Sequence, residues 1–164
     1  MTPRASRPPI PSREEYGPLG DEPAGHPVDW AEVVGWLEEA RYYWLVTARP
    51  DGRPHAAAVW AVWVDSRLFL TTAPGTVTAL VLAANPRALA HLESATDVAI
   101  VEGRAAQLAP EDVPPAAVDA YASKYDWRIE PDDPGMPYFA LAPELVLAWR
   151  LPDIRGTAMR WRFD

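Results

Sequence analysis

The sequence predicts a small α+β barrel, a fold class in which mostly antiparallel strands close on themselves and a few helices cover the outside. Three observations lead to this prediction. About seven segments have the apolar, β-branched composition of strands, about three have helical periodicity, and most of the strands follow one another directly. A doubly wound sheet would instead alternate strands with helices. The length of 164 residues suits one domain with a sizeable core.

Residues 1–28 are predicted to form a proline-rich, flexible arm. Seven prolines fall within residues 1–27 and large apolar side chains are few, so this segment cannot bury enough surface to offset the entropy of ordering. The barrel domain is expected over residues 29–164. It begins with a helix, because Asp29 and Glu32 have the spacing of a capping box. The apolar residues that follow recur at helical spacing, namely Trp30, Val33, Val34 and Leu37.

The remaining elements follow from composition and turn signals. Pro54–Val64 is almost continuously apolar, which predicts one strand buried on both faces. Asp65 and Ser66 are expected to form a tight turn into the next strand. Helices are expected over residues 76–84 and from Pro114, and the other strands over residues 42–48, 68–72, 88–93, 97–108, 138–142, 145–151 and 157–163.

Charge and composition exclude several classes of function. The formal net charge is −8, whereas nucleic acids and anionic membrane surfaces both require basic partners. The chain has no cysteine, so disulfides, thiolate metal sites and a cysteine nucleophile are excluded. No apolar run approaches the ~20 residues that cross a bilayer, and no secretory signal is visible. We therefore expect a cytoplasmic protein.

The stretch that joins the strand at 68–72 to the helix at 76–84 has the geometry of an anion site. Free backbone N–H groups and the helix dipole point at a ligand placed at the start of such a helix. However, no lysine or arginine lies between Arg67 and Arg87, although a cation usually completes such a site. The remaining candidate ligands for a phosphate are the amides near Gly75 and Thr76 and the hydroxyls of Thr71, Thr72, Thr76 and Thr78.

Other residue types leave more than one interpretation open. The eight tryptophans are spread over the whole chain, so they fill core and subunit contacts or, for one or two of them, stack on a planar ligand. Lys124 is the only lysine, and any Schiff-base chemistry would depend on it. His26, His55 and His91 are far apart and have no carboxylate at a ligand spacing, which predicts no metal site.

Several short segments, in this order, resemble the pyridoxamine 5′-phosphate oxidase-like superfamily, and within it the actinobacterial flavin/deazaflavin oxidoreductase branch. The resemblance extends from Trp30 to the C-terminus. It implies a split β-barrel of about six to seven mostly antiparallel strands, a homodimer with two equivalent sites at the subunit interface, and FMN or coenzyme F420 as the carrier of hydride or electrons. The segments that carry it are Tyr43-Trp44-Leu45-Val46-Thr47, Asp51-Gly52-Arg53-Pro54-His55, Val59-Trp60, Asn85-Pro86-Arg87, Val101-Glu102-Gly103 and Arg160-Trp161-Arg162-Phe163.

The resemblance also implies residues of a cofactor site. In the family, the strand that corresponds to His55, Val59 and Trp60 lies beside the cofactor. A C-terminal pair, here Arg160 and Trp161, often reaches the same site. Ordinary barrel packing is the alternative for Val59 and Trp60.

The phosphate-binding cations of the family are missing from this chain. Relatives have arginine or lysine at positions that hold Gly75, Val77, Thr78 and Leu80 here. Losing two or three hydrogen bonds to a charged group, at roughly 1.5–3 kcal/mol each, weakens binding about a thousandfold. Replacement cations would have to come from elsewhere in the fold or from the other subunit, and the candidates are Arg53, Arg87, Lys124, Arg128, Arg155 and Arg160.

Three functions therefore compete. The first is an FMN- or F420-dependent oxidoreductase that acts on a small, aromatic or conjugated organic substrate. The second is a split barrel that has lost its cofactor and acts as a ligand-binding protein or a cofactor-independent enzyme, because Val77 and Leu80 make the former phosphate corner apolar. The third is a haem protein, with an axial ligand drawn from His26, His55 and His91.

Overall fold

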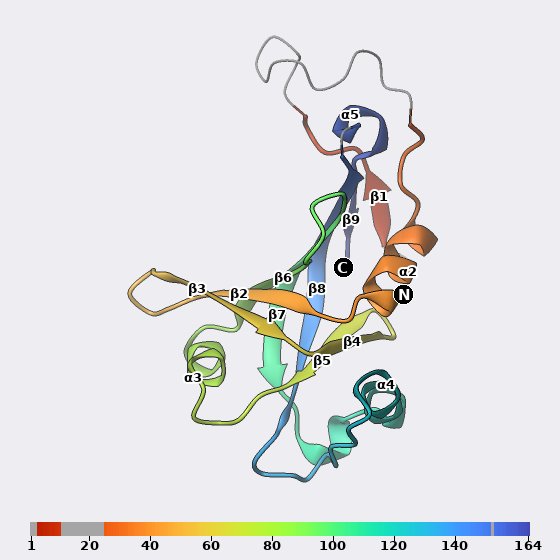
Figure 1. Ribbon diagram of the computed structural model, residues 1–164. Helices are drawn as coiled ribbons and strands as arrows, with labels where there is room; N and C mark the ends of the chain where they lie inside the picture. Colours follow the sequence, from red (N-terminus) through yellow and green to blue (C-terminus); the bar gives the residue numbers. More distant parts are fainter. Residues whose placement is uncertain (1–2, 11–24, 152) are drawn as a thin grey trace.

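One nine-stranded antiparallel sheet curls into a split β-barrel with helices on its outside, as the sequence predicts (Figure 1). The structure is a computed structural model, which describes residues 3–10, 25–151 and 153–164. The strands are β1 (Arg4–Ser6), β2 (Tyr43–Ala48), β3 (Pro54–Val59), β4 (Ala61–Val64), β5 (Arg67–Thr71), β6 (Arg87–Leu92), β7 (Asp97–Gln107), β8 (Tyr138–Arg150) and β9 (Met159–Arg162). The helices are α2 (Trp30–Glu39), α3 (Val77–Ala84), the 3-10 turn η1 (Pro110–Asp112), α4 (Pro115–Tyr125) and α5 (Ile154–Thr157).

The split lies between β3 and β4. Along the sheet the strands follow the order β1-β9-β8-β7-β6-β2-β3, and β5 pairs with both β8 and β4. In the described part of the chain β3 is bonded only to β2 and β4 only to β5, although a single residue, Trp60, separates β3 from β4 in the sequence. The chain therefore changes from one edge of the barrel to the other at Trp60.

The predicted single strand over Pro54–Val64, buried on both faces, is wrong in its first half. Residues of β3 alternate between exposed and half-buried, whereas Ala61, Val62 and Trp63 of β4 are all buried. The reason is that β4 has the barrel interior on one face and α4 on the other, while β3 is an edge strand with no helix over it. An apolar run cannot reveal which part of it will be covered.

Two hydrophobic clusters account for this double burial. The first fills the barrel and is closed by α2, with Leu37, Leu70 and Trp161 among its members. The second lies between α4 and the other face of β4, β5 and β8, and includes Phe69 and Tyr121. Because side chains alternate along β5, Leu70 enters the first cluster and Phe69 the second. Each such fully buried side chain contributes roughly 1.5–3 kcal/mol to folding.

Local sequence signals are confirmed where a short segment determines its own hydrogen bonds. The capping box is present, since the amide of Glu32 donates to Asp29 Oδ1 (2.8 Å) and the amide of Asp29 to Glu32 Oε2 (2.9 Å). The β4–β5 turn has φ values of 47° at Asp65 and 60° at Ser66, as a type I′ hairpin requires. Thr76 is the N-cap of α3.

The C-terminal part differs from the prediction in its boundaries. Residues 138–142 and 145–151, expected as two strands, are one long strand, β8. It passes Pro143 through an irregularity in its pairing with β7, where the register shifts between Glu102 and Gly103. A side chain at Gly103 would overlap the carbonyl oxygen of Ala142, so the close approach of the two strands requires glycine there.

The predicted flexible arm over residues 1–28 falls partly on positions 1–2 and 11–24, which lie outside the described residues. Within the described part of this segment, Arg4–Ser6 form β1, which pairs with β9, and Val28 is buried. Flexibility of the arm stays a prediction.

Among the helices that the structure describes, none is long and apolar enough to cross a membrane.

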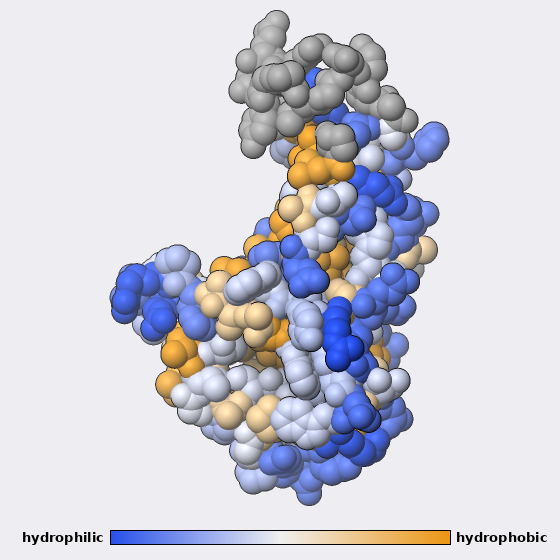
Figure 2. Space-filling model, viewed as in Figure 1, coloured by the Kyte–Doolittle hydropathy of each residue, from blue (hydrophilic) through white to orange (hydrophobic). Residues whose placement is uncertain are grey.

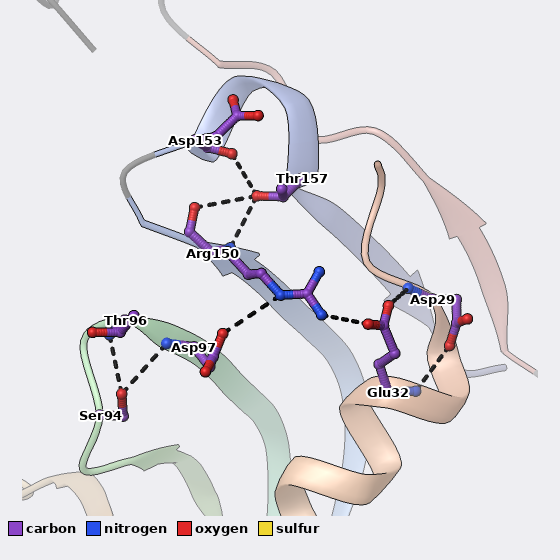
Figure 3. A network of polar contacts seen from close by, with 8 residues as sticks. All are labelled: Asp29, Glu32, Ser94, Thr96, Asp97, Arg150, Asp153 and Thr157. Atoms are coloured by element: carbon purple, nitrogen blue, oxygen red, sulfur yellow. Dashed lines mark hydrogen bonds and ion pairs between the residues drawn. The ribbon is translucent and has the colours of Figure 1, made fainter. Parts of the chain in front are cut away.

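A polar network ties the first helix to the end of the sheet (Figure 3). Arg150, at the end of β8, forms an ion pair with Glu32 of α2, and its Nε lies 3.6 Å from Asp97 Oδ1 at the start of β7. The amide of Arg150 also donates to the hydroxyl of Thr157 in α5 (2.9 Å). The Asp29 amide and the Arg150 guanidinium hold the pKa of the Glu32 carboxyl below its ordinary value, despite some opposing desolvation.

This lowered pKa predicts a pH-dependent contribution to stability. The folded state favours the charged carboxylate, so its contribution is present above the ordinary pKa of 4.5 and is lost as the pH falls through the lower folded value. Glu32→Gln keeps a cap acceptor but removes the charge. We expect it to lower the free energy of unfolding by about 0.5–1 kcal/mol at neutral pH, because the pair is partly exposed.

Urea unfolding of both proteins at neutral pH and below pH 4 measures this difference. The gap between variant and wild type should shrink on acidification. Glu111→Gln, in the exposed η1 turn, is the matched control and should show no gap at either pH. A gap for Glu32→Gln that stays constant with pH would contradict the prediction.

Candidate functional site

A neutral cleft lies where β3, the end of β5, the start of α3, the helix α4 and the loop after it meet. Its volume is about 460 Å³, within the range of roughly 300–1,000 Å³ that is usual for small-molecule sites. None of its lining residues is an aspartate, glutamate, lysine or arginine. Seven of the predicted site residues line it, namely His55, Val59, Trp60, Thr71, Thr72, Thr76 and Thr78.

The position of Trp60 depends on the hydroxyl of Tyr125 in α4. The amide of Ala61 donates to this hydroxyl (2.8 Å), and the carbonyl oxygens of Ala61 and Arg41, each 2.8 Å away, share its single hydrogen. The backbone that leaves β3 is thereby bonded to a helix instead of to a neighbouring strand. Burial raises the pKa of Tyr125 to about 12, so its hydroxyl keeps its proton and stays a donor.

Aromatic rings form one wall of the cleft. The rings of Trp60 and Tyr125 are stacked, with centroids 4.6 Å apart and an angle of 8° between their planes. Trp127, in the loop after α4, meets Trp60 edge to face at 6.1 Å. Both tryptophans stay well exposed, at 38% and 45%. Partly exposed indole rings of this kind favour a planar, apolar ligand.

The loop that carries Trp127 is anchored by the two residues that follow it. Arg128 forms ion pairs with Asp119 of α4 and with Glu130. Ile129 is buried, and its carbonyl oxygen accepts a hydrogen bond from the hydroxyl of Tyr138 (3.1 Å). Trp127 is therefore held at the cleft by its sequence neighbours.

The opposite wall consists of hydroxyl groups that bond to the protein itself. Thr76 Oγ1 accepts from the amide of Ala79 (3.2 Å) and donates to the carbonyl of Ala73 (2.9 Å). Because its only hydrogen is used there, the hydroxyl of Thr72, 2.8 Å away, is the donor to Thr76 Oγ1. Neither of these two hydrogens is free for an anion.

The other two predicted threonines also have partners. His55 Nε2 lies 3.3 Å from Thr78 Oγ1, which links β3 to the first turn of α3. Thr71 Oγ1 lies 3.2 Å from the hydroxyl of Tyr121, which links the end of β5 to α4. These pairs position the cleft walls relative to one another.

The start of α3 offers backbone donors to an anion but no cation. The amides of Val77 and Thr78 occupy the first two helical positions, where no carbonyl of the helix is available as an acceptor, and a Cβ at Gly75 would meet only open space. These donors suit one anion. No cation lines the cleft, and the first turns of α3 expose Val77 (41%) and Leu80 (60%) instead.

The structure brings most, but not all, of the predicted site residues together. Gly75 precedes Thr76 but does not line the cleft. Lys124 Nζ donates to the carbonyl of Ala40 at the end of α2 (3.0 Å), and burial lowers the pKa of its ammonium group. Arg160 Nε donates to Ser6 Oγ, and Trp161 is buried in the barrel. Within one chain these last three residues lie away from the cleft.

Sequence reasoning missed part of the aromatic wall. Trp127 and Met136 line the cleft from the proline-rich loop, and Tyr125 holds Trp60 from behind. A tryptophan within a polar, proline-rich loop was the available signal for Trp127. Tyr121 lines the cleft and is at the same time buried against Tyr125.

A second cavity of about 510 Å³ lies on the outer face of the sheet, between β2, β6 and the β7–β8 pair. Val46, Leu89 and Leu145 line it, and on the same face of β2 Trp44 is 42% exposed. Figure 2 shows this side as a hollow with apolar patches.

Among the described residues, no group of three or more His, Asp or Glu side chains could hold a metal ion.

A split barrel whose cleft lies beside the strand–turn–helix of β5 and α3 is the fold of the pyridoxamine 5′-phosphate oxidase-like superfamily. The family model of pyridoxamine 5′-phosphate oxidase matches residues 30–150, and the chain belongs to this family. No curated protein matches the sequence.

Solved structures share this fold at low sequence identity. An F420 reductase is 24% identical, with 68% of this chain and 93% of that chain covered and a TM-score of 0.55. A conserved hypothetical protein from Mycobacterium tuberculosis is 21% identical, with 80% and 90% covered and a TM-score of 0.64. A FAD-binding protein from Mesorhizobium loti is 18% identical, with 83% and 96% covered and a TM-score of 0.56.

The Tyr125 hydroxyl predicts a specific stability effect. Tyr125→Phe keeps the ring that stacks on Trp60 but leaves the buried amide of Ala61 without its partner. We expect the free energy of unfolding in urea to fall by about 1–3 kcal/mol, and acrylamide to quench tryptophan emission more strongly because Trp60 is less restrained. The control Tyr42→Phe removes an exposed hydroxyl and should cost within about 0.5 kcal/mol. Equal losses for the two variants would refute the role of Tyr125.

Proposed function

We propose that the protein is an oxidoreductase that uses FMN or coenzyme F420 to oxidise or reduce a small, planar organic substrate. The observation that carries this proposal is the neutral cleft itself, with exposed indole faces on one wall and the free amides of α3 at one end. The volume of the cleft suits one flavin or deazaflavin ring system. Membership of the pyridoxamine 5′-phosphate oxidase family supports the choice of cofactor class.

In this proposal the chemistry resides in the bound cofactor, which supplies the hydride or electrons. The chain's own residues bind and orient. Trp60 and Trp127 cover a ring face and exclude water. The amides of Val77 and Thr78 are placed to bind one anionic group. His55, held by Thr78, is the imidazole that lines the cleft and is available to donate or accept one hydrogen bond.

The same observations favour a second candidate, a split barrel that binds a neutral planar ligand without any cofactor. The absence of charged side chains from the cleft lining and the exposure of Val77 and Leu80 support it. The two candidates differ in one measurable respect, which is whether a flavin or deazaflavin binds.

Titration of the purified protein with FMN, F420 and riboflavin distinguishes them. We expect saturable but reversible binding, with dissociation constants in the micromolar range, because the family's cations at α3 are absent. Trp60→Ala should weaken binding of the ring about tenfold. Leu151→Ala, an exposed residue just beyond the end of β8 and outside the cleft, should leave it unchanged. Failure of every flavin and deazaflavin to bind would favour the second candidate.

We also propose that two copies of the chain pair through the outer face of the sheet, with the sites at their interface. The exposed Trp44 and the half-buried Leu89 give this face apolar surface, and such patches mark interaction surfaces. The second cavity on the same face is also lined by Arg87, Glu102, Glu144 and Arg162, which could form ion pairs across an interface. Arg160 lies on β9 opposite Leu147 of β8, beside this face, which supports a contribution of the partner's Arg160 to a site in such a dimer.

Sedimentation equilibrium tests this assembly. The wild type should sediment as a dimer, and Leu89→Asp should shift it towards a monomer because it places a charge in the interface. Leu80→Asp, on the exposed side of α3, should remain dimeric. A wild-type monomer at all concentrations would overturn the proposal.

A further inference from the structure

Four of the six candidate replacement cations lie away from the start of α3 and contact other groups there. Lys124 bonds to the end of α2, Arg87 pairs with Glu144 and Arg128 pairs with Asp119 and Glu130. Arg160 bonds to Ser6 next to β1. Among the candidates, Arg53 is different, because it lies in the β2–β3 turn close to α3.

A third cavity, of about 440 Å³, lies between this turn and α3. The turn contributes Arg49, Pro50, Asp51 and Arg53 to its lining, so that two arginines face one aspartate there. The helix contributes the exposed side chains of Val77 and Leu80. Figure 2 shows the same arrangement, with hydrophobic surface over α3 directly beside the hydrophilic tip of the β2–β3 turn. The groove thus has an apolar floor and a cationic rim.

This groove adjoins the neutral cleft. Val77 lines both cavities, so the two meet at the first residue of α3. A ligand whose ring lies against Trp60 and Trp127 can therefore extend past the free amides of α3 and across Val77 into the groove. Its far end would then face Arg49 and Arg53.

The two arginines are available to bind an anion. Arg53 pairs with Asp51 (2.7 Å), but the two side chains are 72% and 51% exposed, and an exposed pair of this kind is weak. Among the described residues the Arg49 side chain makes no hydrogen bond or short ion pair, although its charge helps to lower the pKa of Asp51. The turn is held by the amide of Arg49, which donates to the carbonyl of Arg53, and by the amide of Gly52, which donates to the carbonyl of Arg49. With two guanidinium groups against one carboxylate, the turn has an unbalanced positive charge.

We propose that Arg49 and Arg53 bind the phosphate or carboxylate tail of a ligand whose planar ring occupies the cleft. The β2–β3 turn thereby replaces the cations that α3 lacks, and it does so from the opposite side of Val77. The guanidinium fork suits both phosphate and carboxylate groups. This inference rests on the proposed function, because it concerns the tail of the same ligand.

Paired ligands that differ only in the tail test the proposal. FMN is compared with riboflavin, and F420 with its deazaflavin core, which lacks phosphate and glutamyl groups. Binding is followed by ligand fluorescence with the wild type, the double variant Arg49→Ala/Arg53→Ala, and the control Arg67→Ala, whose exposed residue lies in the β4–β5 hairpin outside the three cavities that the structure describes.

We expect the wild type to bind each tailed ligand at least about tenfold more tightly than its tailless partner. The double variant should lose this preference and bind the tailless ligands as the wild type does, which also shows that it is folded. Added salt should weaken only the tailed ligands. Arg67→Ala should behave as the wild type.

The outcomes separate this inference from the proposed function. Equal affinity of the wild type for FMN and riboflavin, and for F420 and its core, would overturn the role of the turn while leaving ring binding intact. A preference for the tail that survives in the double variant would also overturn it. If none of the four ligands binds, both the proposed function and this inference are wrong.

Discussion

The hydroxyl of Tyr125 is the contact on which the shape of the cleft depends. Where β3 gives way to β4, the backbone has no neighbouring strand on one of its edges, and this hydroxyl bonds there to the amide of Ala61 and to the carbonyls of Ala61 and Arg41. A buried amide left without a partner costs about 1–3 kcal/mol, so the break in the sheet is stable only with α4 docked against it. The ring of Tyr125 also stacks on the indole ring of Trp60.

Placing a helix at the split has a second consequence, because it gives the barrel two cores. The interior cluster holds α2 against the strands, and the cluster under α4 buries the outer face of β4 and β5. Tyr121 belongs to the second cluster and also lines the cleft, where it meets Thr71. The cleft wall is therefore part of a packed core, which restricts its motion and preorganises it for a rigid ring.

The distribution of charge leaves the cleft with few groups that could bind the phosphate of a ligand. Its cleft lining is neutral, the hydroxyls of Thr72 and Thr76 bond inwards, and Lys124 is held at α2. Each of these arrangements stabilises the fold but removes a donor from a phosphate. An anionic ligand would thus meet the two free amides of α3 first and charged groups only beyond Val77.

The sequence by itself was sufficient for features that depend on neighbouring residues. The capping box at Asp29, the type I′ turn at Asp65 and the Thr76 cap of α3 each arise from hydrogen bonds and dihedral preferences within a few residues. The fold class and the family resemblance likewise follow from the chain alone, and seven of the site residues predicted in this way line one cleft.

Only the tertiary structure decided which apolar residues are covered and which charges are free. Pro54–Val64 is one uniform run in the sequence, yet it divides at Trp60 because a tyrosine 64 residues after Ala61 provides the missing hydrogen bonds. Lys124 lies away from the cleft because its ammonium group bonds to the carbonyl of Ala40, 84 residues away in the sequence. The arginines of the β2–β3 turn face α3 across a groove. Such contacts depend on long-range packing, which a local pattern does not encode.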